Sequence, residues 1–254
     1  MTFTDDHTRK VWFYFMKEKS EVFSHFQKFK AMVEKEKGMQ IKCLRSDGGG
    51  EYLSNEFTDF LSEQGIKRQF TCRYTPQQNG VAERKNRHIA EIAHALMNEK
   101  NMPHYFWAEA VLTVVYIMNR TPTAAVHGMT PEQKFTGTKP NVAHLKVFGC
   151  IAYVHVPDEV RTKLDPKAEK CIFIGYSLEQ KGYRCYNPTT REMRVSRDVV
   201  FDEMSSWYAP ARIEEDADVR SADAVPQAQQ QSEVLRGPRE SSSSGSIVKH
   251  GQVG

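Results

Sequence analysis

The chain has 254 residues, a mean hydropathy of −0.60 and a formal net charge of +3. No apolar run reaches the ~20 residues that a membrane helix needs, so we expect no membrane span. The odd number of cysteines, with no pair at zinc-ligand spacing, predicts reduced thiols and no structural zinc site. They are Cys43, Cys72, Cys150, Cys171 and Cys185.

Strand-like and helix-like segments alternate over the first part of the chain. The predicted strands cover residues 8–16, 41–45 and 67–72. The predicted helices begin at the cap residues Ser20, Ser54, Thr75 and Thr130, with a further apolar helix over 105–119. The first of these helices is expected to end at Gly38. This alternation favours an α/β domain, which we place at residues 1–138.

The predicted secondary structure changes after residue 138. Four or five short strands between 147 and 201, separated by turn residues, predict a small β-barrel over 139–206. Residues 209–254 contain no aromatic side chain and are rich in acidic residues, glutamine and serine. We therefore expect residues 207–254 to form a disordered tail.

Two segments carry residues suited to phosphoryl-transfer chemistry. Asp47 follows a predicted strand and precedes three glycines, and Glu83 lies early in a predicted helix. Magnesium prefers oxygen ligands, and carboxylates on rigid elements beside an open surface could hold it against a nucleic-acid phosphate. Each acid also has a purely structural interpretation. Asp47 could shape a turn, and Glu83 could be a solvated first-turn acid paired with Arg87.

The two segments together resemble a known family. Arg45-Ser-Asp47-Gly-Gly-Gly-Glu-Tyr52 and Tyr74-Thr-Pro-Gln-Gln-Asn-Gly-Val-Ala-Glu83 are similar to the second and third acidic motifs of retroviral-type integrases, especially the copia branch. The resemblance extends over roughly residues 1–206. It implies an RNase H-like core followed by an SH3-like barrel, with Asp47 and Glu83 as catalytic metal ligands. The implied cofactor is Mg²⁺ or Mn²⁺, expected only with the complete site.

The resemblance to the family is incomplete. Such integrases use three acids, and the first lies on a strand before the segment that Thr2–Asp6 matches, so we expect an incomplete core that lacks this strand. The resemblance places Asp5 and Asp6 in a turn rather than at the metal. A sheet without that strand would expose an edge that can pair with another chain. Arg73 and Gly48 also depart from the usual family residues.

Basic and amide side chains surround the start of the predicted helix. A basic cluster over residues 67–87 comprises Lys67, Arg68, Arg73, Arg84, Lys85 and Arg87. Of these, Arg84, Lys85 and Arg87 could bind phosphates independently of base sequence. The amides of Gln77, Gln78 and Asn79 could contact phosphate or base edges. A solvated helix face is the alternative interpretation of the basic cluster.

Three functional hypotheses follow from these residues. The first is an integrase fragment that processes and joins DNA, inactive alone because its first acid is absent. The second is a non-catalytic nucleic-acid-binding or scaffolding remnant, and the third is an RNase H-type nuclease. The resemblance implies DNA as partner, self-association in the full integrase and a location in the nucleus or cytoplasm.

Overall fold

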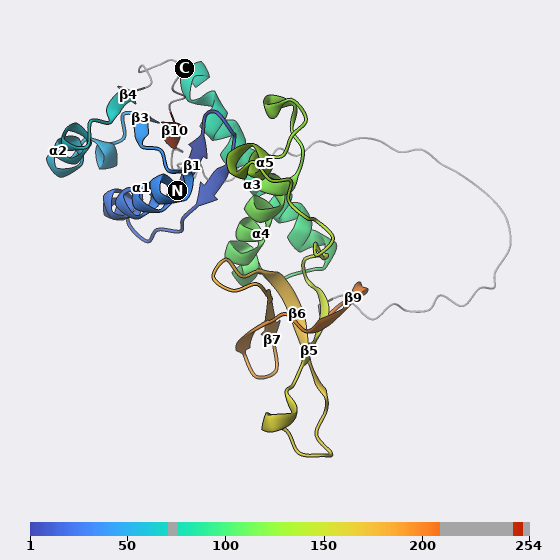
Figure 1. Ribbon diagram of the computed structural model, residues 1–254. Coiled ribbons are helices and arrows are strands. Elements are labelled where there is room, and N and C mark those ends of the chain that lie inside the picture. The colour runs from blue at the N-terminus through green and yellow to red at the C-terminus, as the bar shows by residue number, and fades with distance from the viewer. Residues whose placement is uncertain (71–75, 209–245, 251–254) are drawn as a thin grey trace, which may run out of the picture.

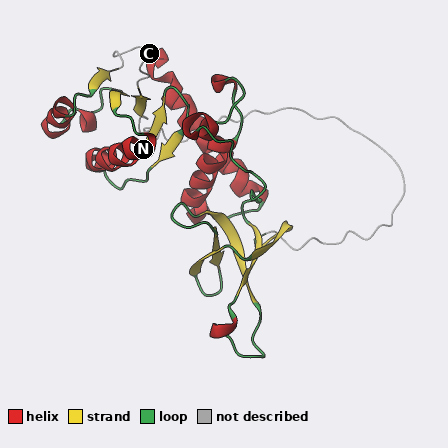
Figure 2. Cartoon of the chain, in the orientation of Figure 1, coloured by secondary structure: helices red, strands yellow, loops and turns green. Residues whose placement is uncertain are grey.

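The computed structural model describes residues 1–70, 76–208 and 246–250 (Figure 1). Over these residues the chain forms two five-stranded sheets. Helices lie beside the first sheet and between the two sheets, as the colouring by secondary structure shows (Figure 2). This arrangement agrees with the predicted α/β core followed by a small β domain.

The first sheet has the strand order β2-β1-β10-β3-β4. Its strands are β1 (Thr2–Asp5), β2 (Val11–Phe13), β3 (Ile41–Ser46), β4 (Lys67–Phe70) and β10 (Ser246–His250). β1 and β2 form an antiparallel pair, and β3 and β4 form a parallel pair. β10 lies between these two pairs, parallel to β1 and antiparallel to β3.

Helices cover both faces of this sheet. On one face, α1 (Val22–Lys37) and α2 (Asn55–Glu63) pack against Phe3 and Leu44, which are fully buried. On the other face, α3 (Pro76–Glu99) and α4 (Trp107–Arg120) pack around Val11. The alternation of side chains along β1 and β2 supplies both apolar surfaces. A short helix, α5 (Pro131–Thr136), packs beside α4.

Helix termini follow the predicted caps at Ser54 and Thr130. Each side chain accepts a hydrogen bond from the backbone N–H three residues later. Gly38 ends α1 with a φ of 66°, a left-handed conformation that suits glycine. The predicted cap at Ser20 is wrong, because a 3₁₀ turn over Lys19–Glu21 precedes α1. Thr75 lies outside the described residues.

The predicted strand over 8–16 is shorter than expected. Only Val11–Phe13 is extended, because residues 6–8 form a turn between β1 and β2. The Asp5 carboxylate holds this turn by accepting hydrogen bonds from the backbone N–H of Thr8, at 3.0 Å, and from its hydroxyl. Local side-chain bonding therefore shortens a run of β-forming residues.

The second sheet is antiparallel throughout, with the order β8-β7-β6-β5-β9. Its strands are β5 (Cys150–His155), β6 (Ala168–Tyr176), β7 (Tyr183–Asn187), β8 (Glu192–Ser196) and β9 (Val199–Ser206). This sheet agrees with the predicted small barrel. The limits 1–138 and 139–206 fall in loops, between α5 and β5 and directly after β9, and remain a prediction.

α4 joins the core to the second sheet. Its residues Val111, Val114 and Val115 share one apolar cluster with Ile172 and Ile174 of β6. The predicted buried role of this apolar helix is confirmed, because these three valines are at most 7% exposed.

Polar contacts fix the same junction. The Arg184 guanidinium on β7 donates two hydrogen bonds to the Glu109 carboxylate on α4, at 2.6 and 3.0 Å. The Lys100 ammonium, just after α3, donates to the backbone oxygens of Glu203 and Met204 on β9, at 2.7 and 3.2 Å. Hydrogen bonds from β7 and to β9 therefore add to the apolar packing between the core and the second sheet.

The expectation of a disordered tail over 207–254 differs from the structure at one place. Residues 246–250 form β10, because a gap between β1 and β3 offers backbone partners on both sides. The rest of the expected tail, apart from residues 207 and 208, lies outside the described residues. Within the described part of the chain, no helix is both long and apolar enough to cross a membrane.

Candidate functional site

Asp47 lies where β3 leaves the sheet. Its carboxylate is half-buried and accepts a hydrogen bond from the backbone N–H of Gly49 at 3.3 Å. Open space surrounds the positions that a side chain would occupy at Gly48 and Gly50. Gly48 and Gly50 therefore leave access to the Asp47 carboxylate, whereas the Glu51 carboxylate lies beside Gly49. Tyr52, 1% exposed, anchors the far end of the loop in the core.

Glu83 lies in the second turn of α3 and its side chain is exposed. The preceding residue, Ala82, is buried against the sheet, as is Ile89 two turns further on. This burial fixes the face that α3 presents to the sheet. Ala93 and Met97 continue this buried face, while Leu96 is only half-buried.

The strand register places Asp47 and Thr2 at the same edge of the first sheet. Thr4, Ile247 and Arg45 form one row across β1, β10 and β3. β1 and β3 run in opposite directions, so Thr2 and Asp47 each lie two residues beyond this row at the same edge. They are separated by two strand spacings, roughly 10 Å.

A hydrogen bond ties α3 to this edge. The Thr2 hydroxyl donates to Oδ1 of Asn86 at 2.8 Å. Asn86 is three residues after Glu83 in the helix, so the two lie on neighbouring positions of one face. The contact holds the middle of α3, three residues after Glu83, beside the edge where β3 ends and Asp47 follows. The sequence motifs do not signal this role of Thr2 and Asn86.

The other acids near the start of the chain are engaged elsewhere. The Asp5 carboxylate is 1% exposed and bonds Thr8 in the turn after β1. The Asp6 carboxylate forms an ion pair with Arg9 at 3.0 Å. Both lie at the end of β1 opposite to Thr2, which agrees with the turn role expected for them. No group of three or more acids, histidines or cysteines in the described chain is arranged to hold a metal ion.

The basic residues of α3 flank Glu83. Arg84 and Arg87 are exposed, and the Arg84 guanidinium lies beside the buried Gly80. Burial, followed by the charge of Arg9, lowers the pKa of Lys85. Arg9, which the sequence patterns did not single out, therefore adds positive charge beside this helix. The backbone of Gln77, Gln78 and Asn79 forms the first turn of α3, and their side chains lie outside the description.

Arg68 differs from its neighbours in the predicted basic cluster. Its guanidinium stacks over the Phe70 ring at 4.4 Å and donates to the Thr58 hydroxyl at 2.9 Å. Burial lowers the pKa of this residue. Arg68 therefore belongs to the packing between β4 and α2, and the exposed positive charge lies on α3.

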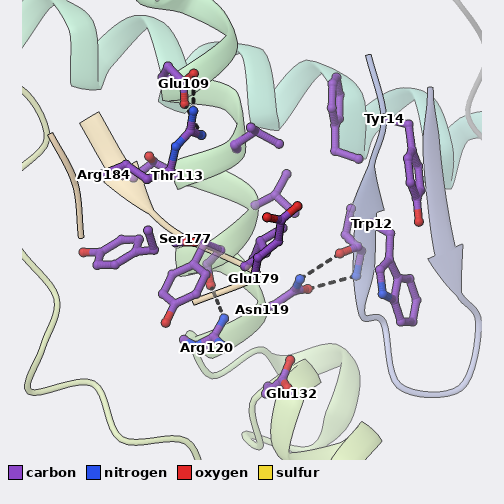
Figure 3. A pocket seen from close by; sticks show the side chains of 18 of the residues that line it. Trp12, Tyr14, Glu109, Thr113, Asn119, Arg120, Glu132, Ser177, Glu179 and Arg184 are labelled. Atoms are coloured by element: carbon purple, nitrogen blue, oxygen red, sulfur yellow. Dashed lines mark hydrogen bonds and ion pairs between the residues drawn. The ribbon is translucent and has the colours of Figure 1, made fainter. Parts of the chain in front are cut away.

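A cleft of about 850 Å³ lies between β2, α4 and the loop after β6, and neither Asp47 nor Glu83 lines it (Figure 3). Its charged side chains are largely paired with one another, including Glu109 with Arg184 and Lys10 with Glu132. The Asn119 side chain closes one wall through two hydrogen bonds to the strand that carries Trp12. The cleft lies at the junction between the core and the second sheet.

The four cysteines in the described part of the chain are all buried and free of disulfides. Burial raises the pKa of Cys150 and of Cys171 to about 12, so both thiols stay protonated near neutral pH. These cysteines are therefore core residues rather than nucleophiles or metal ligands.

Comparison with known proteins identifies both domains. Residues 1–76 match the model of the integrase core domain, and residues 150–215 match the retroviral polymerase SH3-like domain. The chain is 49% identical over 203 residues to the retrovirus-related Pol polyprotein from transposon TNT 1-94 of Nicotiana tabacum. This chain is an integrase segment of the copia-type retrotransposon Pol family.

Two further relatives come from Arabidopsis thaliana. The integrase segment is 40% identical over 201 residues to the Pol polyprotein from transposon RE2, and 38% identical over 201 residues to that from transposon RE1. The matches cover 79–80% of this chain but only 14–15% of the three relatives. The segment thus spans about one seventh of the polyproteins it matches.

A solved structure also resembles the integrase segment. It is a chain of the simian T-cell lymphotropic virus intasome in complex with PP2A regulatory subunit B56 gamma. The TM-score is 0.43 at 15% sequence identity, and the match covers 74% of this chain and 66% of that one.

Proposed function

We propose that this integrase segment takes part in DNA processing and strand transfer, with Asp47 and Glu83 as ligands of a divalent metal ion. The observation that carries the proposal is the shared edge of the first sheet. Asp47 follows β3 at this edge, and the Thr2–Asn86 hydrogen bond holds α3 beside it, three residues after Glu83. Membership of the integrase family supplies the reaction class.

The donor set fits Mg²⁺ or Mn²⁺. Carboxylate oxygens are the ligands that these ions prefer, and few protein ligands suffice when substrate phosphate supplies others. When bound, such an ion polarises a phosphodiester and stabilises the charge that develops on the attacking and leaving oxygens. The Gly49 N–H orients one oxygen of Asp47, and the open space at Gly48 and Gly50 leaves room for an incoming phosphate.

DNA is the proposed substrate because positive charge flanks the site on α3. Arg84 and Arg87 are exposed beside Glu83, and Lys85 lies close enough to Arg9 for their charges to interact. Such contacts attract phosphates without reading sequence. Gln77, Gln78 and Asn79 precede these residues on the same helix, and we include their amides in the proposed DNA contact. Element ends and target DNA are the proposed partners, and self-association belongs to the full integrase.

The test places residues 1–206 in the matching region of the tobacco polyprotein and measures DNA joining with Mg²⁺ or Mn²⁺. Asp47→Asn and Glu83→Gln should each reduce joining at least about 100-fold, because each removes a charge that holds the metal. Asp59→Asn on α2 and Glu91→Gln on α3 make the same chemical changes at exposed positions and should leave joining unchanged. Joining that persists in Asp47→Asn would remove this residue from the site.

A second candidate function is DNA binding without chemistry. It is favoured by one observation, namely that the described residues contain no group of three potential metal ligands. The segment by itself should then shift DNA in a gel in a salt-dependent manner and show no metal-dependent nicking. Nicking of duplex DNA that Asp47→Asn abolishes would exclude this candidate. Cleavage restricted to RNA–DNA hybrids would instead indicate an RNase H-type nuclease.

A further inference from the structure

β10 occupies the centre of the first sheet, although it comes from near the C-terminal end of the chain. Figure 1 shows it between β1 and β3. Ser246, Ile247 and Val248 pair in parallel with residues 3–5 of β1. Residues 247–250 pair in antiparallel fashion with β3, with an irregularity between Lys249 and His250. β10 thus lies between the β1–β2 pair and the β3–β4 pair, and neither pair includes it.

The gap has the properties of a strand-binding site. β1 and β3 both direct backbone N–H and C=O groups into it, and buried polar groups of this kind require partners. Phe3, Ile41 and Leu44, which lie beside the gap, pack in one apolar cluster with residues of α1 and α2. Two ordered edges therefore face each other at the spacing of one missing strand.

The occupant is held differently from its neighbours. β10 has five residues, and its β-branched Ile247 and Val248 favour an extended backbone. The described element before it in the chain is β9, which belongs to the other sheet. Residues 207–245 link β10 to that sheet, so neither β1 nor β3 is joined to β10 by a tight turn. A strand attached in this way can leave and return without unfolding its neighbours.

We propose that the gap between β1 and β3 is a strand-binding site, and that Ser246–His250 docks in it in cis as an exchangeable strand. The binding mode is strand addition to both edges, in which main-chain hydrogen bonds supply most of the affinity. β10 lies outside both family matches, which end at residue 215. Docking holds β1 and β3 in register and so fixes the edge that carries Asp47. It does not require the segment to act on DNA.

The first test uses proline, which removes a backbone donor from a sheet ladder. Val248→Pro should undock β10, whereas Val253→Pro makes the same change outside the strand. Amide hydrogen exchange is followed by NMR along β1 and β3. In Val248→Pro, the β3 amides that face the gap should exchange at least about 100-fold faster. The alternate β3 amides that face β4 should keep more protection and so serve as an internal reference.

Unchanged protection of the gap-facing amides in Val248→Pro would overturn the proposal. A second measurement uses the vacated gap. A labelled peptide of residues 244–252 is titrated into the Val248→Pro chain, in which the tethered strand no longer competes, with a peptide carrying proline at position 248 as control. Saturable binding of the native peptide alone supports exchange at the gap, and equal or absent binding of both peptides contradicts it. Light scattering completes the test, because a monomer supports docking in cis and a strand-swapped dimer overturns it.

Discussion

The side-chain amide of Asn119 bonds both backbone groups of Val11. Its Nδ2 donates to the Val11 carbonyl oxygen at 2.7 Å, and its Oδ1 accepts from the Val11 N–H at 2.9 Å. Val11 lies on β2, the outer strand of the first sheet, and Asn119 lies on α4. The amide therefore takes the place of a neighbouring strand and closes an edge that could otherwise pair with another chain.

Asn119→Asp should destabilise the protein by about 2–3 kcal/mol, since it leaves the buried Val11 carbonyl without its donor and buries a charge. Asn98→Asp makes the same change at an exposed position of α3 and should cost little. Urea unfolding of the two variants measures the difference. Equal midpoints would show that the amide does not hold β2.

Gly175 marks the closest approach between α4 and β6. Its φ is 138°, and a Cβ built there would lie 2.7 Å from the Thr113 hydroxyl oxygen. Gly175→Ala should lower the free energy of unfolding by about 1–3 kcal/mol through backbone strain, with the contact adding to this. Gly137→Ala isolates the backbone part, because Gly137 has a φ of 81° and open space around it. If Gly175→Ala lowers the free energy of unfolding no more than Gly137→Ala does, the contact with Thr113 contributes nothing to stability.

His144 makes the stability of the junction depend on pH. Burial, then Arg120 and Lys181, lower the pKa of His144 below 6.5, and its Nε2 is hydrogen-bonded to the Tyr116 hydroxyl at 2.8 Å. Tyr176 also packs against the ring. The unfolded chain therefore binds a proton more readily than the folded one, and stability falls as pH falls below about 6.5 towards the lowered pKa.

His144→Gln should remove this part of the pH dependence. Urea midpoints between pH 5 and 7.5 would show a smaller decline for the variant than for the native chain. Identical slopes for the two proteins would mean that His144 titrates alike in both states.

The proposed DNA surface on α3 predicts a change in salt dependence. Arg84→Gln and Arg87→Gln should each weaken DNA binding and reduce the slope of log K against log salt by about 0.9, since each removes one phosphate contact. Lys28→Gln removes an exposed charge from α1 and should leave the slope unchanged. Gel shifts at several salt concentrations provide the slopes. A slope that Lys28→Gln changes as much would indicate attraction by net charge alone.

Local signals in the sequence predicted much of the core. The caps at Ser54 and Thr130 and the stop at Gly38 are confirmed, because each depends on neighbouring residues only. The strand predicted over 8–16 is shorter in the structure, because the Asp5 side chain bonds Thr8 in the turn after β1. The run of β-forming residues gave no sign of this turn. The position of Asp47 at a strand end followed from the same kind of local pattern.

Contacts between residues far apart in the chain could not be predicted from the sequence. β10 is extended because two distant strands offer it partners, and the composition around it predicted disorder. The Thr2–Asn86 bond and the Asn119–Val11 bonds likewise join residues far apart in the chain. Arg68 was predicted to belong to the basic cluster, but its guanidinium packs against Phe70 and so has a structural role. Such contacts depend on the assembled fold rather than on spacing along the chain.

The most direct test of a shared metal site is paramagnetic broadening by Mn²⁺, measured by NMR on residues 1–206 isotope-labelled within the matching region of the tobacco polyprotein, which supplies the rest of the site. The amides of Gly48 and Gly49 and those of Glu83 and Arg84 should broaden together as Mn²⁺ is added. Both sets should stay sharp in Asp47→Asn, whereas Asp59→Asn should behave like the native chain. Broadening near Glu83 that survives in Asp47→Asn, or broadening confined to one of the two segments, would contradict the account.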